Sequence, residues 1–180
     1  MNSESVTAAC EAEAVDFLFR EPSFRESLGD ELGITTWQSR FRIPRERLGL
    51  SAAAPGDIDV LIAPDADARR AIAFECKRVK VPAKALVDPT GVPNKLCELP
   101  KAIRQTSELA ETGFHQAFLM VIVQIDARLH PAANWFCRGL RPDLVKTIRD
   151  AVDLTNLHRD AGVIIVTNFF DIVLFPELAS

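Results

Sequence analysis

Hydrophobic and polar residues alternate through two stretches in the first half of the chain, residues 57–62 and 71–77. Alternation with a period of two is typical of a half-buried β-strand. The expected inner faces are Ile58, Val60 and Ile62 in the first stretch and Ile72, Phe74 and Cys76 in the second. The opposite faces carry Asp57, Asp59 and Leu61, and then Ala73, Glu75 and Lys77. Both stretches therefore place charged groups on one side of a strand.

The residues between these two strands, 64–70, are turn formers and charges, so the pattern predicts an antiparallel hairpin over 57–63 and 71–77. If its midpoint is Asp67, Asp59 and Glu75 lie opposite each other, with Cβ atoms roughly 5 Å apart. Like charges at that separation destabilise a strand pair unless a cation lies between them. Lys77, about 6.6 Å along the strand from Glu75, supplies part of that charge, and a divalent metal would supply the rest.

The arrangement of Asp59, Glu75 and Lys77, with the lead-in Gly56–Asp59, resembles the PD-(D/E)xK, or restriction-endonuclease-like, nuclease superfamily. The resemblance implies an α/β fold with an αβββαβ core, in which a mixed central sheet is flanked by helices. It also implies a metal-dependent nuclease that hydrolyses DNA. Asp59, Glu75 and the backbone carbonyl of Cys76 would hold Mg²⁺, or Mn²⁺ as a substitute, through hard oxygen ligands. Lys77 would orient the attacking water or stabilise the transition state.

Two alternatives to this interpretation stay open. The acids and the lysine of a surface hairpin can form solvated ion pairs, each of which contributes about 0–1 kcal/mol. A catalytically inactive nuclease-fold module that binds nucleic acid or a protein partner is the second alternative. The intact set of Asp59, Glu75 and Lys77 favours the enzyme, because a domain without catalysis has little need of three such groups at these spacings.

The remaining pattern predicts helices and strands in an order that suits this family. Pro22 and Gly29–Gly33 are expected to break the chain. The expected elements are helices over 4–20, 99–112 and 141–158, and strands over 35–43, 118–123, 162–166 and 171–175. We expect one domain over 1–180, with the nuclease-like core at about 5–125 and a helix–strand extension at about 126–180.

The first predicted helix carries Glu11 and Glu13 beside its apolar stripe. Some members of the superfamily, notably small Holliday-junction-resolvase-like nucleases, place a glutamate of this helix near the metal. In those helices an Ala follows three residues later, and an aromatic residue and a Leu follow at six and seven. Ala14, Phe17 and Leu18 have this spacing from Glu11, so the resemblance implies Glu11 rather than Glu13 as a metal ligand. A solvated glutamate on a helix face is an equally good explanation.

Lys101, Gln105 and Glu108 recur at helical spacing on one polar side of the helix 99–112. Several superfamily members place a lysine or glutamine of the corresponding helix near the catalytic centre. By that analogy Gln105 is a candidate catalytic residue and Lys101 a candidate nucleic-acid contact. Exposure to solvent alone explains both residues as well.

The charge of the chain is unevenly distributed, although the net charge is −4. Residues 1–39 contain 2 basic and 8 acidic side chains, residues 40–104 contain 13 and 8, and residues 105–180 contain 6 and 9. The basic excess coincides with the candidate site, and Arg40, Arg42, Arg45 and Arg47 cluster just before the hairpin. Guanidinium groups bind phosphates well, so we expect DNA contacts from Arg40, Arg42 and Lys80. Solvated arginines on a strand edge are an equally common explanation. Such binding is electrostatic and largely independent of sequence.

Composition excludes several other classes of protein. No apolar run reaches the roughly 18 residues that cross a bilayer, and the first residues lack the pattern of a signal peptide. Four widely spaced cysteines make a zinc or iron–sulfur site unexpected and favour reduced thiols in a cytoplasmic protein; they are Cys10, Cys76, Cys97 and Cys137. Phosphate-binding glycine motifs are absent. DNA is the expected partner, membranes are not, and a homodimer or a protein partner stays open.

Overall fold

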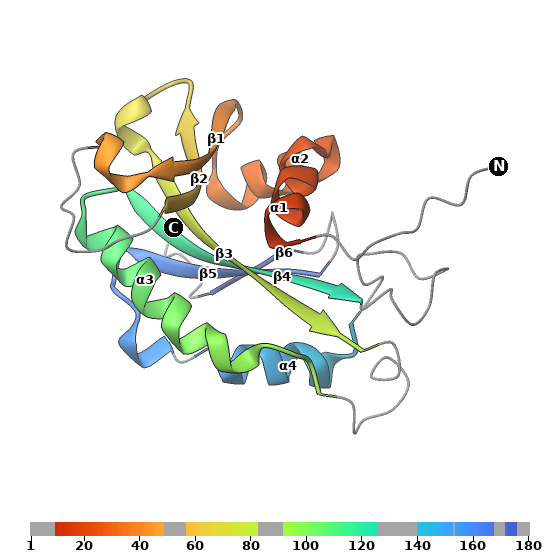
Figure 1. Cartoon of the computed structure of the whole chain (residues 1–180). Coiled ribbons are helices and arrows are strands. Elements are labelled where there is room, and N and C mark those ends of the chain that lie inside the picture. The colour runs from red at the N-terminus through yellow and green to blue at the C-terminus, as the bar shows by residue number, and fades with distance from the viewer. Residues whose placement is uncertain are drawn as a thin grey trace.

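The computed structural model describes residues 10–48, 57–82, 92–125, 140–152, 154–167 and 172–175. The α-helices in these ranges are α1 (Glu11–Arg20), α2 (Pro22–Leu32), α3 (Leu99–Glu111) and α4 (Pro142–Ala151). Figure 1 shows α1 and α2 on one face of a sheet and α3 and α4 on the other. The predicted α/β class with a mixed sheet between helices is therefore confirmed.

The sheet has six strands in the described part of the chain, and their spatial order is the order of the sequence. The strands are β1 (Trp37–Pro44), β2 (Asp57–Pro64), β3 (Ile72–Val81), β4 (Gln116–Ile125), β5 (Ala161–Val166) and β6 (Ile172–Phe175). The pairs β1–β2, β2–β3 and β5–β6 are antiparallel, whereas β3–β4 and β4–β5 are parallel. Helix α3 connects β3 to β4, as a crossover between parallel strands requires.

The second helix, α2, corrects the expectation that Pro22 and the following glycines break the chain. Pro22 occupies the first turn of α2, where its missing N–H costs nothing. Gly29 lies within the helix, and a Cβ there would come within 2.7 Å of the Ile34 carbonyl oxygen. Only Gly33, at the C-cap with φ +64°, ends the helix. Gly29 is thus required by close packing and not by a turn.

The hairpin between β2 and β3 has the predicted register. The paired residues are Val60 with Phe74, Leu61 with Ala73, and Ile62 with Ile72. Each pair is equidistant from Asp67, which caps a short 3-10 turn, η2 (Ala68–Arg70), by accepting the Arg69 N–H. The turn chemistry and the alternation therefore fix the same midpoint.

The expectation that Ile58 shares a face with Val60 and Ile62 is wrong. Val60 and Ile62 pack with α1 and α2, whereas Ile58 packs against α3. The change occurs at Asp59, opposite Arg42, where the ladder between β1 and β2 is interrupted and Arg42 has φ +49°. A left-handed residue reverses the alternation of a strand, because it turns the next side chain to the other face. Asp59 lies where the side chains change from one face of the sheet to the other.

The core consists of apolar clusters on the two faces of the sheet. Phe74, Cys76 and Met120 pack under α1 and α2, while Val79, Val121 and Ile165 pack under α3 and α4. The central strand β4 is covered on both sides and is buried from Ala117 to Gln124. Continuous burial suits parallel strands and agrees with the apolar run in the sequence.

Other boundaries differ in detail from those expected. Helix α4 ends at Ala151 because Val152 takes an extended conformation, and the predicted tail of this helix becomes a 3-10 turn, η6 (Leu154–Asn156). On α1, Phe17 is 45% exposed, whereas Val15 and Phe19 are buried. Cys137 and the start of the predicted extension, 126–139, lie outside the described residues. No helix in the described ranges is long and apolar enough to cross a membrane.

Candidate metal centre

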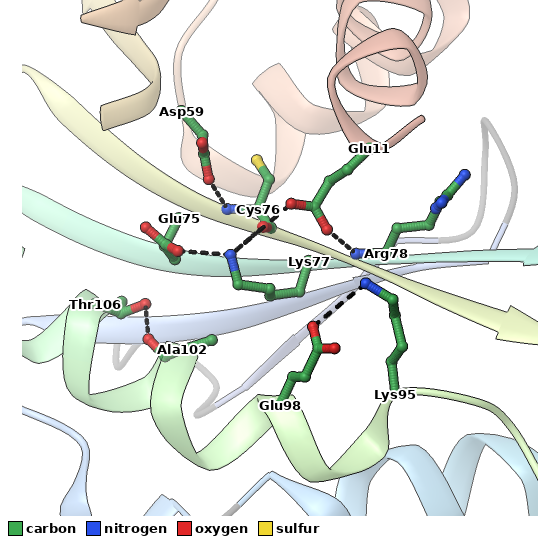
Figure 2. A network of polar contacts seen from close by, with 10 residues as sticks. All are labelled: Glu11, Asp59, Glu75, Cys76, Lys77, Arg78, Lys95, Glu98, Ala102 and Thr106. Carbon is green, nitrogen blue, oxygen red and sulfur yellow. Dashed lines mark hydrogen bonds and ion pairs between the residues drawn. The ribbon is translucent and has the colours of Figure 1, made fainter. Parts of the chain in front are cut away.

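Strands β2 and β3 are not paired beyond Val60–Phe74. There, carboxylates accept hydrogen bonds from the edge of β3 that faces β2. Alternate residues of a strand turn their N–H groups to the same edge. Beyond Phe74, the next such group on the edge facing β2 is that of Cys76, which donates to Asp59 Oδ2 at 2.7 Å. The one after it, of Arg78, donates to Glu11 Oε2 at 2.8 Å. Asp59 and Glu11, 48 positions apart in the sequence, thus meet at one strand edge (Figure 2).

The ammonium group of Lys77 lies among three oxygen-bearing groups at this opening. Lys77 Nζ donates to Glu75 Oε1 at 2.7 Å and to the Cys76 carbonyl oxygen at 2.9 Å. It also lies 3.9 Å from Glu11 Oε1. Figure 2 shows the ammonium between the Glu75 carboxylate and the Cys76 carbonyl. A cation is therefore already favoured at this point.

A small cavity of about 80 Å³ adjoins the opening on the α1 side, and Glu11, Asp16, Arg42 and Asp59 belong to its lining. Arg42 Nη2 donates to Asp16 Oδ2 at 3.2 Å across it. A non-glycine residue with positive φ costs about 1–3 kcal/mol of backbone strain, and such strain is concentrated at functional sites. The strained Arg42 directs its guanidinium group to Asp16, on the α1 side of this cavity.

Burial and nearby negative charge raise the pKa values of both Asp59 and Glu75. Burial raises the pKa of Asp59 above 3.8, although the Cys76 N–H and Lys77 oppose the rise. Burial and then the charge of Asp59 raise the pKa of Glu75 above 4.5, against the effects of Lys77 and Arg45. Burial and neighbouring negative charge therefore disfavour the ionisation of both carboxylates, which an additional cation between them would relieve.

The same surroundings also shift the pKa values of Lys77 and Cys76. Burial acts to lower the pKa of Lys77, but the hydrogen bond and charge of Glu75 outweigh it and raise that pKa above 10.5. Burial holds the pKa of the Cys76 thiol well above 9.0, so this residue contributes its backbone carbonyl and not a thiolate. Lys77 is a permanent positive charge at neutral pH.

The donor set fits a hard divalent cation that also binds water and substrate. No three Asp, Glu, His or Cys side chains within the described ranges gather closely enough to form a metal site by themselves. Asp59, Glu75 and the Cys76 carbonyl supply oxygens on the two separating strands. Mg²⁺ is commonly held by one or two carboxylates and keeps several waters or phosphate oxygens. The observed set matches that manner of binding and not an all-protein cage.

The two glutamates of α1 have different roles in the structure. Glu13 Oε2 accepts the Cys10 N–H at 2.6 Å and completes a capping box of its own helix. Glu11 instead reaches β3. Of the two, Glu11 is the residue at the site.

The candidates on α3 lie on its polar side, and Gln105 makes no hydrogen bond with the residues of the opening. Glu108 forms an ion pair with Arg45, so the polar side of α3 faces the end of β1. Gln105 lies one turn earlier on that side and is half-buried, whereas Lys101, a further turn away, is exposed. No hydrogen bond connects Gln105 to Asp59, Glu75 or Lys77.

The basic candidates divide into exposed and buried groups. Arg40 and Arg42 are exposed on the edge strand β1, and Lys80 is half-buried on β3. Arg45, from the same cluster in the sequence, is 3% exposed and cannot contact a DNA backbone as it stands. No sequence signal distinguishes it from its neighbours, because its burial depends on the packing of β1 against α3.

Comparisons with known proteins add little to this geometry. No family model and no curated protein matches the chain. Among solved structures, the chain is similar to SfsA of Pyrococcus furiosus, a structure in complex with Ca²⁺, with a TM-score of 0.35 and 15% identity. The match covers 92% of this chain and 64% of that chain. A likeness at this TM-score decides neither fold nor activity, so the site rests on its own contacts.

Proposed function

We propose that this protein is a metal-dependent nuclease that hydrolyses DNA phosphodiester bonds. One observation carries the proposal: Asp59, Glu75, the Cys76 carbonyl and Lys77 converge where β2 separates from β3. Burial raises the pKa of both Asp59 and Glu75, and the charge of Asp59 adds to the rise at Glu75. Two such carboxylates, next to a lysine in a basic segment, suit the binding of a metal and a phosphate together.

We also propose a restriction-endonuclease-like fold for the chain. The order of the helix α1, the strands β1 to β3, the helix α3 and the strand β4 supports this assignment. An antiparallel hairpin followed by a parallel crossover supports it as well. Helix α2 and the elements after β4 are additions to the proposed core.

Asp59, Glu75 and the Cys76 carbonyl would hold Mg²⁺ or Mn²⁺, with Glu11 close enough to bind through water. The bound metal would lower the pKa of a water molecule and stabilise charge on the phosphate. The residues of the chain position the substrate around it. Arg42 and Arg40 lie exposed on β1 and would contact the DNA backbone, with Lys80 and Lys101 as further contacts.

Lys77 would act in the chemical step. Its ammonium group cannot bind a metal, yet it is held within 2.9 Å of the Cys76 carbonyl oxygen. A phosphate that enters the opening would offer oxygen acceptors to the three N–H groups of the Lys77 ammonium. Lys77 would then exchange its bond to Glu75 for one to the phosphate or to the attacking water, and would stabilise developing negative charge.

An inactive module that binds nucleic acid or protein is the second candidate, and one observation favours it. The carboxylates of Asp59, Glu11 and Glu75 each accept a hydrogen bond from a donor of the chain itself. Such a network can stabilise the open edge of β3 without any metal. In that case Asp59, Glu75 and Lys77 would be structural.

Cleavage of plasmid and oligonucleotide DNA by the purified chain separates the two candidates. We expect cleavage with Mg²⁺ or Mn²⁺, and binding with little turnover with Ca²⁺, which polarises water less. Glu75→Ala should be inactive. Asp65→Ala, which removes an exposed acid at the far end of the same hairpin, should match the parent. Equal cleavage in the presence of a chelator would exclude the proposed enzyme.

A further inference from the structure

Two side chains at the carboxyl ends of β3 and β4 have buried hydrogen-bond donors without acceptors. Arg78 is half-buried, and its Nε and Nη1 atoms have no acceptor within the described ranges. Gln124 is 4% exposed, and its amide nitrogen Nε2 has no acceptor there either. Buried donors without acceptors are uncommon, so each one calls for an explanation. A ligand that brings acceptors would provide it.

The two side chains lie on the same face of the sheet and close to each other. In the parallel pair β3–β4, Arg78 lies beside Ile122, and Lys80 lies beside Gln124. Cys76 and Ile122 belong to the core under α1 and α2, so alternation places Arg78, Lys80 and Gln124 on that face as well. Neighbouring strands are about 4.8 Å apart, and Gln124 is one diagonal step from Arg78. A single ligand would therefore reach both side chains.

A phosphate group suits these donors better than a neutral or a cationic ligand. Arg78 brings a positive charge, and half-buried Lys80 adds a second one on the same face. The free donors of Arg78 and Gln124 all require oxygen acceptors. Phosphate offers several oxygens that carry negative charge, and its hydrogen bonds to a guanidinium group are strong. The carboxyl ends of parallel strands are also where ligands of α/β sheets bind.

This group of donors adjoins the candidate metal centre. The Arg78 N–H donates to Glu11 Oε2 at 2.8 Å, and Glu11 Oε1 lies 3.9 Å from Lys77 Nζ. Figure 2 shows the Arg78 guanidinium on the side of β3 where Glu11 lies, directed away from the Lys77 ammonium. Arg78 follows Cys76 by two residues, or about 6.6 Å along the strand. That spacing resembles the spacing of successive phosphates in one DNA strand.

We propose that Arg78 and Gln124, with Lys80 beside them, form a subsite for a phosphate group of the substrate other than the phosphate that is cleaved. The proposal rests on the proposed function, because it takes DNA as the source of that phosphate. The group is either a terminal phosphate or an internal one of the same strand. A terminal phosphate held there would fix the distance from the DNA end at which the metal centre cuts.

DNA binding in Ca²⁺, measured by fluorescence anisotropy, tests the subsite with little turnover. Arg78→Met should weaken the binding of an oligonucleotide about tenfold, and Gln124→Met about threefold, because each variant removes donors to the phosphate. The double variant should lose less than the product of the two losses, because both side chains bind one group. Losses that multiply independently would overturn a shared subsite.

Three single-stranded oligonucleotides of one sequence distinguish the two sources of the phosphate. One carries a 5′-phosphate, one a 3′-phosphate, and one neither. A loss on Arg78→Met that appears only with one terminal phosphate supports a terminal group. An equal loss with all three supports an internal group. No loss with any of them overturns the proposal.

Two matched variants serve as controls. Gln116→Met changes the same residue type at the other end of β4, and Arg70→Met removes an exposed arginine at the hairpin tip. Both should bind DNA as the parent does. A loss in these controls equal to the loss in Arg78→Met and Gln124→Met would overturn a localised subsite.

Thermal unfolding in a chelator separates binding from a structural role. Inorganic phosphate should raise the unfolding temperature of the parent more than that of Arg78→Met or Gln124→Met. Without phosphate, Gln124→Met should unfold no earlier than the parent, because a buried donor without an acceptor is removed. It also carries the test if Arg78→Met does not fold. A lower unfolding temperature with unchanged stabilisation by phosphate would show a purely structural role.

The results keep this proposal apart from the proposed function. A parent that cleaves no DNA with Mg²⁺, yet is stabilised by phosphate through Arg78 and Gln124, overturns the proposed function and leaves a phosphate site. A parent that cleaves DNA, while the folded Arg78 and Gln124 variants bind DNA as tightly as the parent, overturns the subsite alone.

Discussion

The two halves of β3 meet different partners on the edge that faces β2. From Ile72 to Phe74, the strand pairs with β2 on one side and with β4 on the other. From Glu75 to Val79, the pairing with β4 continues, but the edge facing β2 is bonded to carboxylates. The first half carries apolar side chains and the second carries Glu75, Lys77 and Arg78.

The difference teaches how an opening is stabilised within a sheet. Unpaired strand N–H groups that are buried cost about 1–3 kcal/mol each. Here the side chains of Asp59 and Glu11 satisfy two of them, so that the neighbouring strand can move away without this penalty. The same carboxylates bring negative charge to the opening. An opening lined by carboxylates is thus a direct consequence of the way the edge of β3 is satisfied.

The largest expected effect falls on the half of β3 from Glu75 to Val79, which is not paired with β2. Asp59→Ala and Glu75→Ala should abolish metal binding and cleavage together, because each removes a hard oxygen ligand. The loss of metal-dependent stabilisation is worth several kcal/mol, or about 10³-fold in rate. Calorimetric Mn²⁺ titration beside a nuclease assay measures both properties.

Phe74→Ala provides the contrast from the paired half. Phe74 is fully buried and stacks on Phe118 at 5.7 Å between ring centroids. Its loss should lower the free energy of unfolding by about 3–5 kcal/mol, as measured in urea, while the folded protein still binds Mn²⁺. Loss of Mn²⁺ binding by folded Phe74→Ala would show that the two halves are not separable.

Lys77→Ala should distinguish the chemical step from metal binding. We expect metal affinity to stay the same or to rise slightly, because a neighbouring positive charge is removed. Cleavage should fall by about 10²–10³-fold, as for the loss of one electrostatic donor to a transition state. Parallel loss of metal affinity and cleavage would place Lys77 in the structure of the opening instead.

DNA affinity should depend steeply on salt if the exposed cations beside the opening bind phosphates. The affinity should fall strongly between about 50 and 200 mM salt. Arg42→Ala should weaken binding to all sequences and reduce the salt slope by about one. Arg69→Ala, a 91% exposed arginine at the hairpin tip, is the control and should change neither. Fluorescence anisotropy measures the slope, and a flat response would contradict backbone binding.

The smallest effect concerns the stability of the metal-free protein. The pKa of Asp59 is raised above 3.8 in the folded chain, so its ionised form costs stability at pH values above that raised pKa. Asp59→Asn keeps an acceptor for the Cys76 N–H and should stabilise the chain by about 0.5–2 kcal/mol in a chelator at about pH 8.

This gain should disappear as the pH falls through the raised pKa of Asp59 towards about 4, because the parent then carries a proton at Asp59 as well. Asp57→Asn, an exposed change two residues away, should alter stability by less than about 0.5 kcal/mol. Urea unfolding over that pH range measures both. A gain that grows on acidification would contradict the direction of the shift.

Much of the sheet could be predicted from the sequence, because its strands are marked by local patterns. Alternation and the turn around Asp67 located β2 and β3 and their register. Helix α2 was missed because Pro22 and Gly29 are ordinary breakers, and only the tertiary contact at Ile34 explains Gly29. The reversal of side-chain alternation at Arg42 could not be predicted from the local sequence, since arginine has no preference for positive φ.

The candidate site was harder to predict than the strands around it. Charge alternation identified Glu75 and Lys77 on one face, and their 2.7 Å contact lies within one strand. Arg45 could not be recognised as buried, because its surroundings come from β1 and α3, which are far apart in the sequence. The contact of Glu11 with the Arg78 N–H likewise exists only in three dimensions.

The binding of a divalent cation between Asp59 and Glu75 is tested most directly by anomalous diffraction from crystals that contain Mn²⁺. We expect an anomalous peak about 2.1–2.3 Å from oxygens of Asp59, Glu75 and the Cys76 carbonyl, with Lys77 turned away from Glu75. Crystals of Glu75→Ala should lack the peak. No peak at saturating Mn²⁺, or a peak that touches neither carboxylate, would contradict the proposed site.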